Sequence, residues 1–190
     1  MDGNQVDIPA LVAAVVRKFD LPMFRNDFKS VPNEEAYCQQ FCNIVTHALR
    51  NDPTWSVGAQ AKADDRSLLD FMLIRKDPSG KVTFRAGIEL TASARNQSQS
   101  EHARRSYSTN LQLDQSVIVH FTPIEQRKTK LGFFQEGKDK DGNAVRVPVY
   151  HLFHKGEQDQ YTDFTRAEVV YKPTPETEEP VRVPVFPSFK

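Results

Sequence analysis

The sequence has little cysteine, no excess of either charge and no long apolar run. Only Cys38 and Cys42 are present, which excludes a disulfide framework and favours a reducing compartment. The 25 Lys and Arg residues balance 25 Asp and Glu residues, which argues against a nucleic-acid binder that relies on a basic tail. No stretch approaches the roughly 20 apolar residues that cross a bilayer, so no integral membrane protein is expected.

The sequence also carries no visible targeting signal. A signal peptide needs a basic segment before a longer apolar one, whereas the apolar run from Leu11 to Val16 is short and precedes Arg17 and Lys18. We therefore expect no secretory signal in this chain. The sequence leaves open that the chain is a fragment of a longer precursor.

The length of the chain suits one domain with a C-terminal tail. A chain of 190 residues can bury roughly 70% of its unfolded surface, which is enough for one core. We expect four parts: an N-terminal helix and linker (1–32), a core (33–122), a β-rich extension of the same domain (123–171) and an extended proline-rich tail (172–190). Because prolines recur in the tail, it is not expected to form a helix or a central strand.

Hydrophobic periodicity and capping residues predict the elements. Helices are expected over Ile8–Phe19, from an Asn33 cap to about Arg50, and from the capping box Ser98–Glu101 to about Asn110. Strands are expected over Trp55–Ala61, Ser67–Arg75, Val82–Thr91, Ser116–Phe121, Val145–Phe153 and Arg166–Tyr171. A crossover helix between buried strands predicts an α/β fold with a central mixed sheet flanked by helices.

Two acidic residues lie inside apolar strands, Asp70 in LLDFMLI and Glu89 in AGIEL. A buried carboxylate is costly unless it is paired, hydrogen-bonded or bound to a metal. If the two strands form a hairpin, these acids can lie close together, and such an oxygen pair suits Mg²⁺ or Mn²⁺. Glu34 shares a helix face with Tyr37 and Phe41, so it is a candidate third acid aimed at the sheet.

Each acid also has a plainer interpretation. Glu34, in a first helical turn, complements the helix dipole. Asp70 is a strand-end acid paired with Arg66 or Arg75, and Glu89 is an ordinary ion-pair residue. His151 and His154 could be ligands, but they are three apart in an expected strand, where such residues point to opposite faces.

The order of these motifs resembles the PD-(D/E)xK nucleases. More narrowly, it resembles the restriction-endonuclease-like effector domains of Crinkler proteins from oomycetes and fungi. Those domains carry an acid-led helix, a strand with "DF", a strand reading "GIEL", a helix that begins Glu-His with an arginine three residues after the histidine, and a further buried strand. Here the matching residues are Glu34, Asp70-Phe71, Gly87–Leu90, Glu101, His102, Arg105 and Ser116–Phe121. The resemblance covers about Asn33 to Phe121.

The resemblance implies a metal-dependent phosphodiesterase that acts on DNA. Asp70 and Glu89 would hold Mg²⁺ or Mn²⁺, and Glu34 would support a second ion or orient the first. His102, Arg104 and Arg105 would contact the nucleic acid, and Arg105 would assist at the scissile phosphate. The resemblance further implies a secreted virulence effector that is delivered to the host nucleus. Without such delivery, the expectation is an intracellular protein.

The sequence departs from this pattern at one position. The motif has a lysine two residues after the glutamate, and here that position is Thr91, which cannot supply a cation. Arg95, Arg104 or Arg105 could substitute. The alternative is a weak or inactive nuclease-fold module that binds DNA or a host protein. The run Arg127–Lys130, with Lys138 and Lys140, could form a local basic cleft for DNA, or it is solvated loop charge.

Overall fold

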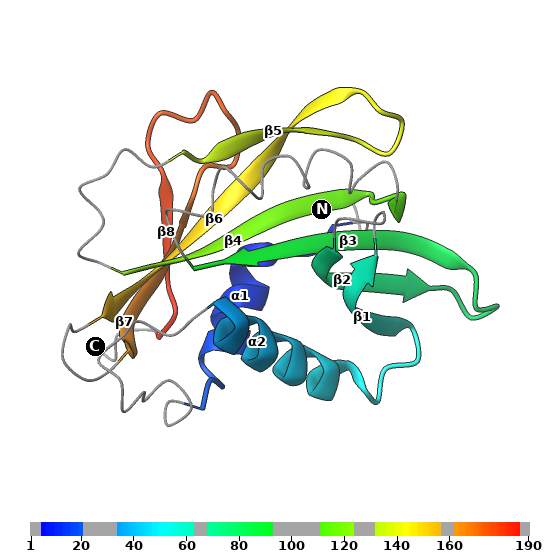
Figure 1. Cartoon of the computed structure of the whole chain (residues 1–190), viewed down its shortest axis with the longest axis horizontal. Helices are drawn as coiled ribbons and strands as arrows, with labels where there is room; N and C mark the ends of the chain where they lie inside the picture. Colours follow the sequence, from blue (N-terminus) through cyan, green and yellow to red (C-terminus); the bar gives the residue numbers. More distant parts are fainter. Residues whose placement is uncertain are drawn as a thin grey trace.

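The computed structural model describes residues 5–20, 34–62, 68–92, 111–123, 132–156 and 162–186. Within these ranges the chain forms two helices and eight strands (Figure 1). The helices are α1 (Ile8–Val16) and α2 (Glu34–Leu49). The strands are β1 (Trp55–Lys62), β2 (Leu68–Lys76), β3 (Val82–Thr91), β4 (Gln115–Pro123), β5 (Phe134–Lys138), β6 (Ala144–Gly156), β7 (Thr162–Tyr171) and β8 (Val181–Pro184).

The strands form one mixed sheet in the order β1-β2-β3-β4-β6-β7-β8, and β5 pairs with β6 beside this path. The pairs β3–β4 and β4–β6 are parallel, and the others are antiparallel. The expected α/β class with a mixed sheet is therefore confirmed. The expected hairpin between β2 and β3 is also present, and Asp77 accepts N–H bonds from Ser79 and Lys81 in its turn.

Both helices cover the same face of the sheet (Figure 1). In α1, Asp7 caps the first turn by accepting the Ala10 N–H at 3.1 Å, as a short acidic cap does. The helix ends at Val16 and not at the expected Phe19. The N–H groups of Lys18 and Phe19 bond to carbonyls three residues back, which tightens the chain into a turn.

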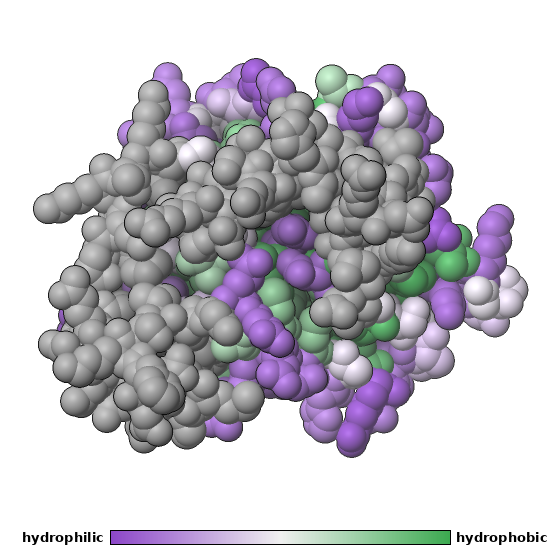
Figure 2. All heavy atoms as spheres, in the orientation of Figure 1, coloured by the Kyte–Doolittle hydropathy of each residue, from purple (hydrophilic) through white to green (hydrophobic). Residues whose placement is uncertain are grey.

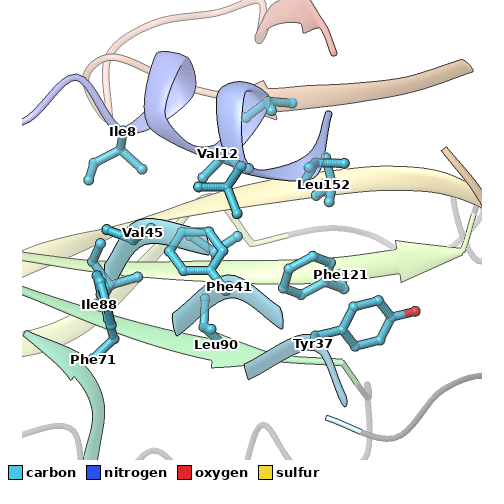
Figure 3. Close-up of a cluster of buried hydrophobic side chains, with 14 of the residues drawn as sticks. Ile8, Val12, Tyr37, Phe41, Val45, Phe71, Ile88, Leu90, Phe121 and Leu152 are labelled. Atoms are coloured by element: carbon cyan, nitrogen blue, oxygen red, sulfur yellow. The ribbon is translucent and has the colours of Figure 1, made fainter. Parts of the chain in front are cut away.

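The main core lies between the helices and this face of the sheet (Figure 3). Tyr37 stacks on Phe121 with ring centroids 4.2 Å apart, and Phe41 meets Phe71 edge-on at 5.6 Å. These contacts use the helical spacing of Tyr37, Phe41 and Val45, which places all three on the buried side of α2. A smaller apolar cluster contains Leu69 and Leu113.

The proline-rich end of the chain joins the sheet. β8 pairs with β7 and stands last in the strand order, where proline is tolerated. Val185 follows β8 and is completely buried in the main core. The expected helix over residues 98–110 lies outside the described residues. No helix that the structure describes is long and apolar enough to cross a membrane.

Candidate active site

The antiparallel ladder between β2 and β3 ends where the two predicted acids begin. Its pairs run from Lys76 opposite Val82 to Phe71 opposite Ile88, so Asp70 and Glu89 are the next residues of each strand. Asp70 Oδ2 accepts the backbone N–H of Leu90 at 2.9 Å. The Asp70 side chain thus joins β2 to β3 through the backbone of the residue that follows Glu89.

The sides on which the β2 residues pack explain this break. Phe71 and Leu73 belong to the main core under the helices, whereas Leu69 packs with Leu113 in the smaller cluster. In a regular strand Leu69 and Phe71 would share one face. The alternation therefore fails at Asp70, which leaves its carboxylate free to turn toward the neighbouring strand.

Glu34 reaches the same end of β3 from α2. Its Oε2 accepts the Ala92 N–H at 3.2 Å, one residue beyond the strand. The carboxylates of Asp70 and Glu34 therefore bind backbone donors on either side of Thr91. This contact ties the first turn of α2 to the sheet, so Glu34 does more than complement the helix dipole.

The Cys38 thiol, one turn after Glu34, is affected by the negative charge of all three acids. Burial raises the pKa of the Cys38 thiol, and the negative charges of Asp70, Glu34, Cys42 and Glu89 raise it further, in that order. Burial followed by the charge of Asp70 raises the pKa of Cys42 to about 11. Both thiols are free and half-buried, as expected for cysteines that pack as small apolar groups.

The donor chemistry of the acids fits a hard cation, but their geometry limits how they would hold it. No three metal-ligating side chains within the described ranges lie close enough to bind one ion together. Mg²⁺ commonly binds through one or two carboxylates and keeps several waters. Asp70 and Glu89 are the candidates for such a smaller set of ligands, whereas the Glu34 carboxylate already holds the end of β3.

Arg75 does not neutralise Asp70. It lies five residues along β2, roughly 16 Å away at the rise of an extended strand. Its guanidinium instead sits over the rings of Trp55 and Phe84, 5.9 Å from each centroid. The other alternative partner, Arg66, falls outside the described residues.

Thr91 occupies the position where the nuclease pattern has lysine. It follows Glu89 by two residues on the same strand face, and it is only 2% exposed. Its hydroxyl oxygen has no hydrogen-bond partner among the residues described. The side chain therefore supplies no charge and is held inside the protein.

A histidine that the sequence reasoning did not select lies beside Thr91. His120 lies in β4, where it is in parallel register with Thr91 of β3 on one side and with His151 of β6 on the other. Both histidines are buried. The signal was present in the sequence, because a polar residue inside the apolar run SVIVHF is as unexpected as Asp70 inside LLDFMLI. His151 and His154 point to opposite faces as predicted, since His154 contacts Tyr37 of α2.

Several predicted contacts with nucleic acid lie outside the described residues, so their positions remain predictions. They are Arg95, His102, Arg104, Arg105 and the basic run 127–130. Of the two lysines near that run, Lys140 forms an ion pair with Asp114 at 2.8 Å, and Lys138 is exposed. The described surface in Figure 2 mixes hydrophilic and hydrophobic residues.

Comparison of the chain with protein-family models, curated proteins and solved structures gave no match.

Proposed function

We propose that this protein is a metal-dependent nuclease that hydrolyses phosphodiester bonds of DNA, with a restriction-endonuclease-like core. The observation that carries the proposal is the bond from the Leu90 N–H to Asp70, at the point where the β2–β3 ladder ends beside Glu89. It shows that the Asp70 side chain turns toward β3 next to Glu89, and it supports the proposal that the two acids act together.

The chemistry of a phosphodiester explains why such a site would need a cation. Two carboxylates would repel the phosphate, whereas a Mg²⁺ or Mn²⁺ ion held by Asp70 and Glu89 would attract it. When bound, the ion would neutralise charge on the phosphate and lower the pKa of a bound water. Glu34 would act through the backbone, by holding Ala92 and thereby the last residues of β3 in place.

The experiment is cleavage of a supercoiled plasmid by the full chain in a Mg²⁺ titration, with EDTA as a control. Asp70→Asn and Glu89→Gln keep the shape of each side chain and remove its charge. We expect both variants to lose cleavage, while Glu35→Gln, on the exposed neighbour of Glu34, cuts like the wild type. Wild-type rates in both variants would show that the site is elsewhere.

A second candidate is a module that binds DNA or a host protein without cutting. The uncharged, buried Thr91 favours it, because the lysine of the nuclease pattern is missing. Salt-dependent DNA binding with no EDTA-sensitive cleavage would support this candidate against the first. Delivery as an effector to a host nucleus is a further proposal that rests on the family resemblance alone.

A further inference from the structure

The β5–β6 hairpin lies on the side of the sheet opposite α1 and α2 (Figure 1). β6 pairs with β4 through residues 149–154 and with β5 through residues 144–148, so the first half of β6 has β5 as its partner. The tip of the hairpin is fixed to the sheet. Lys140 forms an ion pair with Asp114, and Asp114 accepts the N–H of Arg85 in β3.

Glu89 points toward this hairpin. Its neighbours Ile88 and Leu90 belong to the main core under the helices, so the side chain of Glu89 lies on the opposite face of the sheet. A narrow cavity separates this face from the hairpin, and it is partly open to solvent beside Glu89. Its other walls include Leu69, Leu113, Glu136 and Val147.

A wider groove follows the exposed face of the hairpin and meets the cavity at Glu136, which lines both. The groove encloses about 860 Å³ of empty space, part of it open to solvent. Its charged residues are Glu136, Lys138 and Arg146. They share one face of the hairpin, because Lys138 follows Glu136 by two residues and Arg146 lies opposite Glu136 in β6.

Lys138 and Arg146 are the cations that this groove offers to a ligand. Both side chains are exposed, and no ion pair within the described ranges includes either of them. Lys138 lies opposite Ala144, so Arg146 is its diagonal neighbour at about 7–8 Å. Long cationic side chains at this spacing can bind one phosphate group together or two neighbouring ones. Lys140 differs from them, because Asp114 already pairs with it.

We propose that the β5–β6 hairpin is the arm that holds the DNA backbone, with Lys138 and Arg146 on its phosphates. The groove carries one strand past Glu136 to the cavity at Glu89. The inference rests on the proposed nuclease function for that end point, and it names the surface that presents the substrate. Contacts of this kind position a strand without reading its sequence, so they confer no base preference.

Glu136 has the opposite effect in the same groove, because its carboxylate repels a phosphate that passes it. Removal of its charge should therefore tighten DNA binding. Removal of the charge of Lys138 or Arg146 should weaken it. A purely structural role of these three exposed side chains would not produce changes of opposite sign.

The test measures binding of a fluorescently labelled DNA duplex to the full chain by anisotropy, in EDTA and over a series of salt concentrations. Each phosphate contact contributes about 0.9 to the slope of log K against log salt. We expect Lys138→Gln and Arg146→Gln each to lower the slope by about 0.9 and to weaken binding about 8-fold at 0.1 M salt. Glu136→Gln should bind about 2–5-fold more tightly.

Lys81→Gln is the matched control. Lys81 is also an exposed lysine of a β-hairpin, but it lies at the turn between β2 and β3. We expect its slope and affinity to equal those of the wild type. A wild-type slope in the double variant Lys138→Gln/Arg146→Gln would overturn the assignment of the arm, and so would weaker binding by Glu136→Gln.

The outcomes distinguish this surface from the proposed active site. If Asp70→Asn and Glu89→Gln lose plasmid cleavage while the double variant binds and cuts like the wild type, the nuclease site stands and the arm is wrong. If the wild type cuts no DNA with Mg²⁺ but the double variant loses the expected slope, the arm stands and the protein is the binding module. If the wild type binds no DNA at low salt, the arm is wrong.

Discussion

The hydrogen bond from Leu90 to Asp70 gives Asp70 a structural role that can be separated from metal binding. In Asp70→Ala the Leu90 N–H loses its acceptor at the end of the ladder, beside a side chain that is only 1% exposed. A hydrogen bond to a charged group contributes about 1.5–3 kcal/mol net. Asp70 is half-buried, so solvent weakens this bond. We therefore expect a loss of about 1–2 kcal/mol in the free energy of unfolding.

Asp70→Asn should behave differently, because its amide oxygen can still accept from Leu90. It removes the charge but keeps the acceptor, so we expect a stability within about 0.5 kcal/mol of the wild type. This difference makes Asp70→Asn the better variant for the cleavage assay. A loss of activity in it would not be caused by unfolding.

Urea unfolding followed by circular dichroism measures both variants, and thermal melting provides a second reading. For a chain of this size each kcal/mol shifts Tm by about 2–4 °C. Equal midpoints for Asp70→Ala, Asp70→Asn and the wild type would show that the bond to Leu90 carries no stability. Equal losses in the two variants would show that the charge matters, and not the acceptor.

Three further predictions concern the surroundings of the site. Gly87→Ala should cost about 1–3 kcal/mol in urea unfolding, because its Cβ would overlap the Leu113 side chain, and an unchanged midpoint would contradict this contact. The pKa of His151 is lowered by burial, so the unfolded chain binds its proton first as the pH drops below about 6.5. Stability should therefore fall with acid below that pH, with a smaller slope in His151→Asn; equal slopes between pH 8 and 5 would refute the assignment. In a Cys38→Ser background, Cys42 should be alkylated at pH 8 roughly 100-fold more slowly in the native chain than in urea, because its pKa is raised from 9.0 to about 11. Asp70→Asn should speed that reaction, and native rates equal to unfolded rates would exclude the burial of this thiol.

The sequence predicted local structure well where the hydrophobic periodicity and the turn residues indicate the same boundaries. β3 has the bounds that were expected, Val82–Thr91, because its apolar run follows a turn whose Asp and Gly have defined places. β5 was not predicted as a strand. Its sequence FQEGK has no alternating apolar residues, and it forms because β6 is long enough to pair on both sides.

The order of strands could not be read from the sequence. The apolar runs of β3, β4 and β6 show that these strands are buried, but not which strands are neighbours. Tertiary packing decides the parallel placement of β4 between β3 and β6. This placement brings His120 into register with both Thr91 and His151. For that reason the sequence could not show that the histidine in SVIVHF lies beside Thr91.

The acids illustrate the same limit at the level of single residues. Asp70 and Glu89 were identifiable, because carboxylates in apolar strands are costly without a partner. The break in alternation between Leu69 and Phe71 was not identifiable, because a prediction from alternating side chains assumes a regular strand. The break decides the geometry, since it allows the Asp70 carboxylate to replace a backbone carbonyl as the acceptor for β3.

The last residues of β3 join the two halves of the proposed site. Their backbone N–H groups bind Asp70 and Glu34, and the side chain of Thr91 lies beside His120. A strand held by hydrogen bonds at residues 90 and 92 has little freedom to rotate the residue between them. Under the proposed function, these bonds would hold the end of β3 in place next to Glu89, while Asp70 would also supply a ligand. Loss of the Glu34 carboxylate should accordingly impair catalysis through position, with the ligands themselves intact.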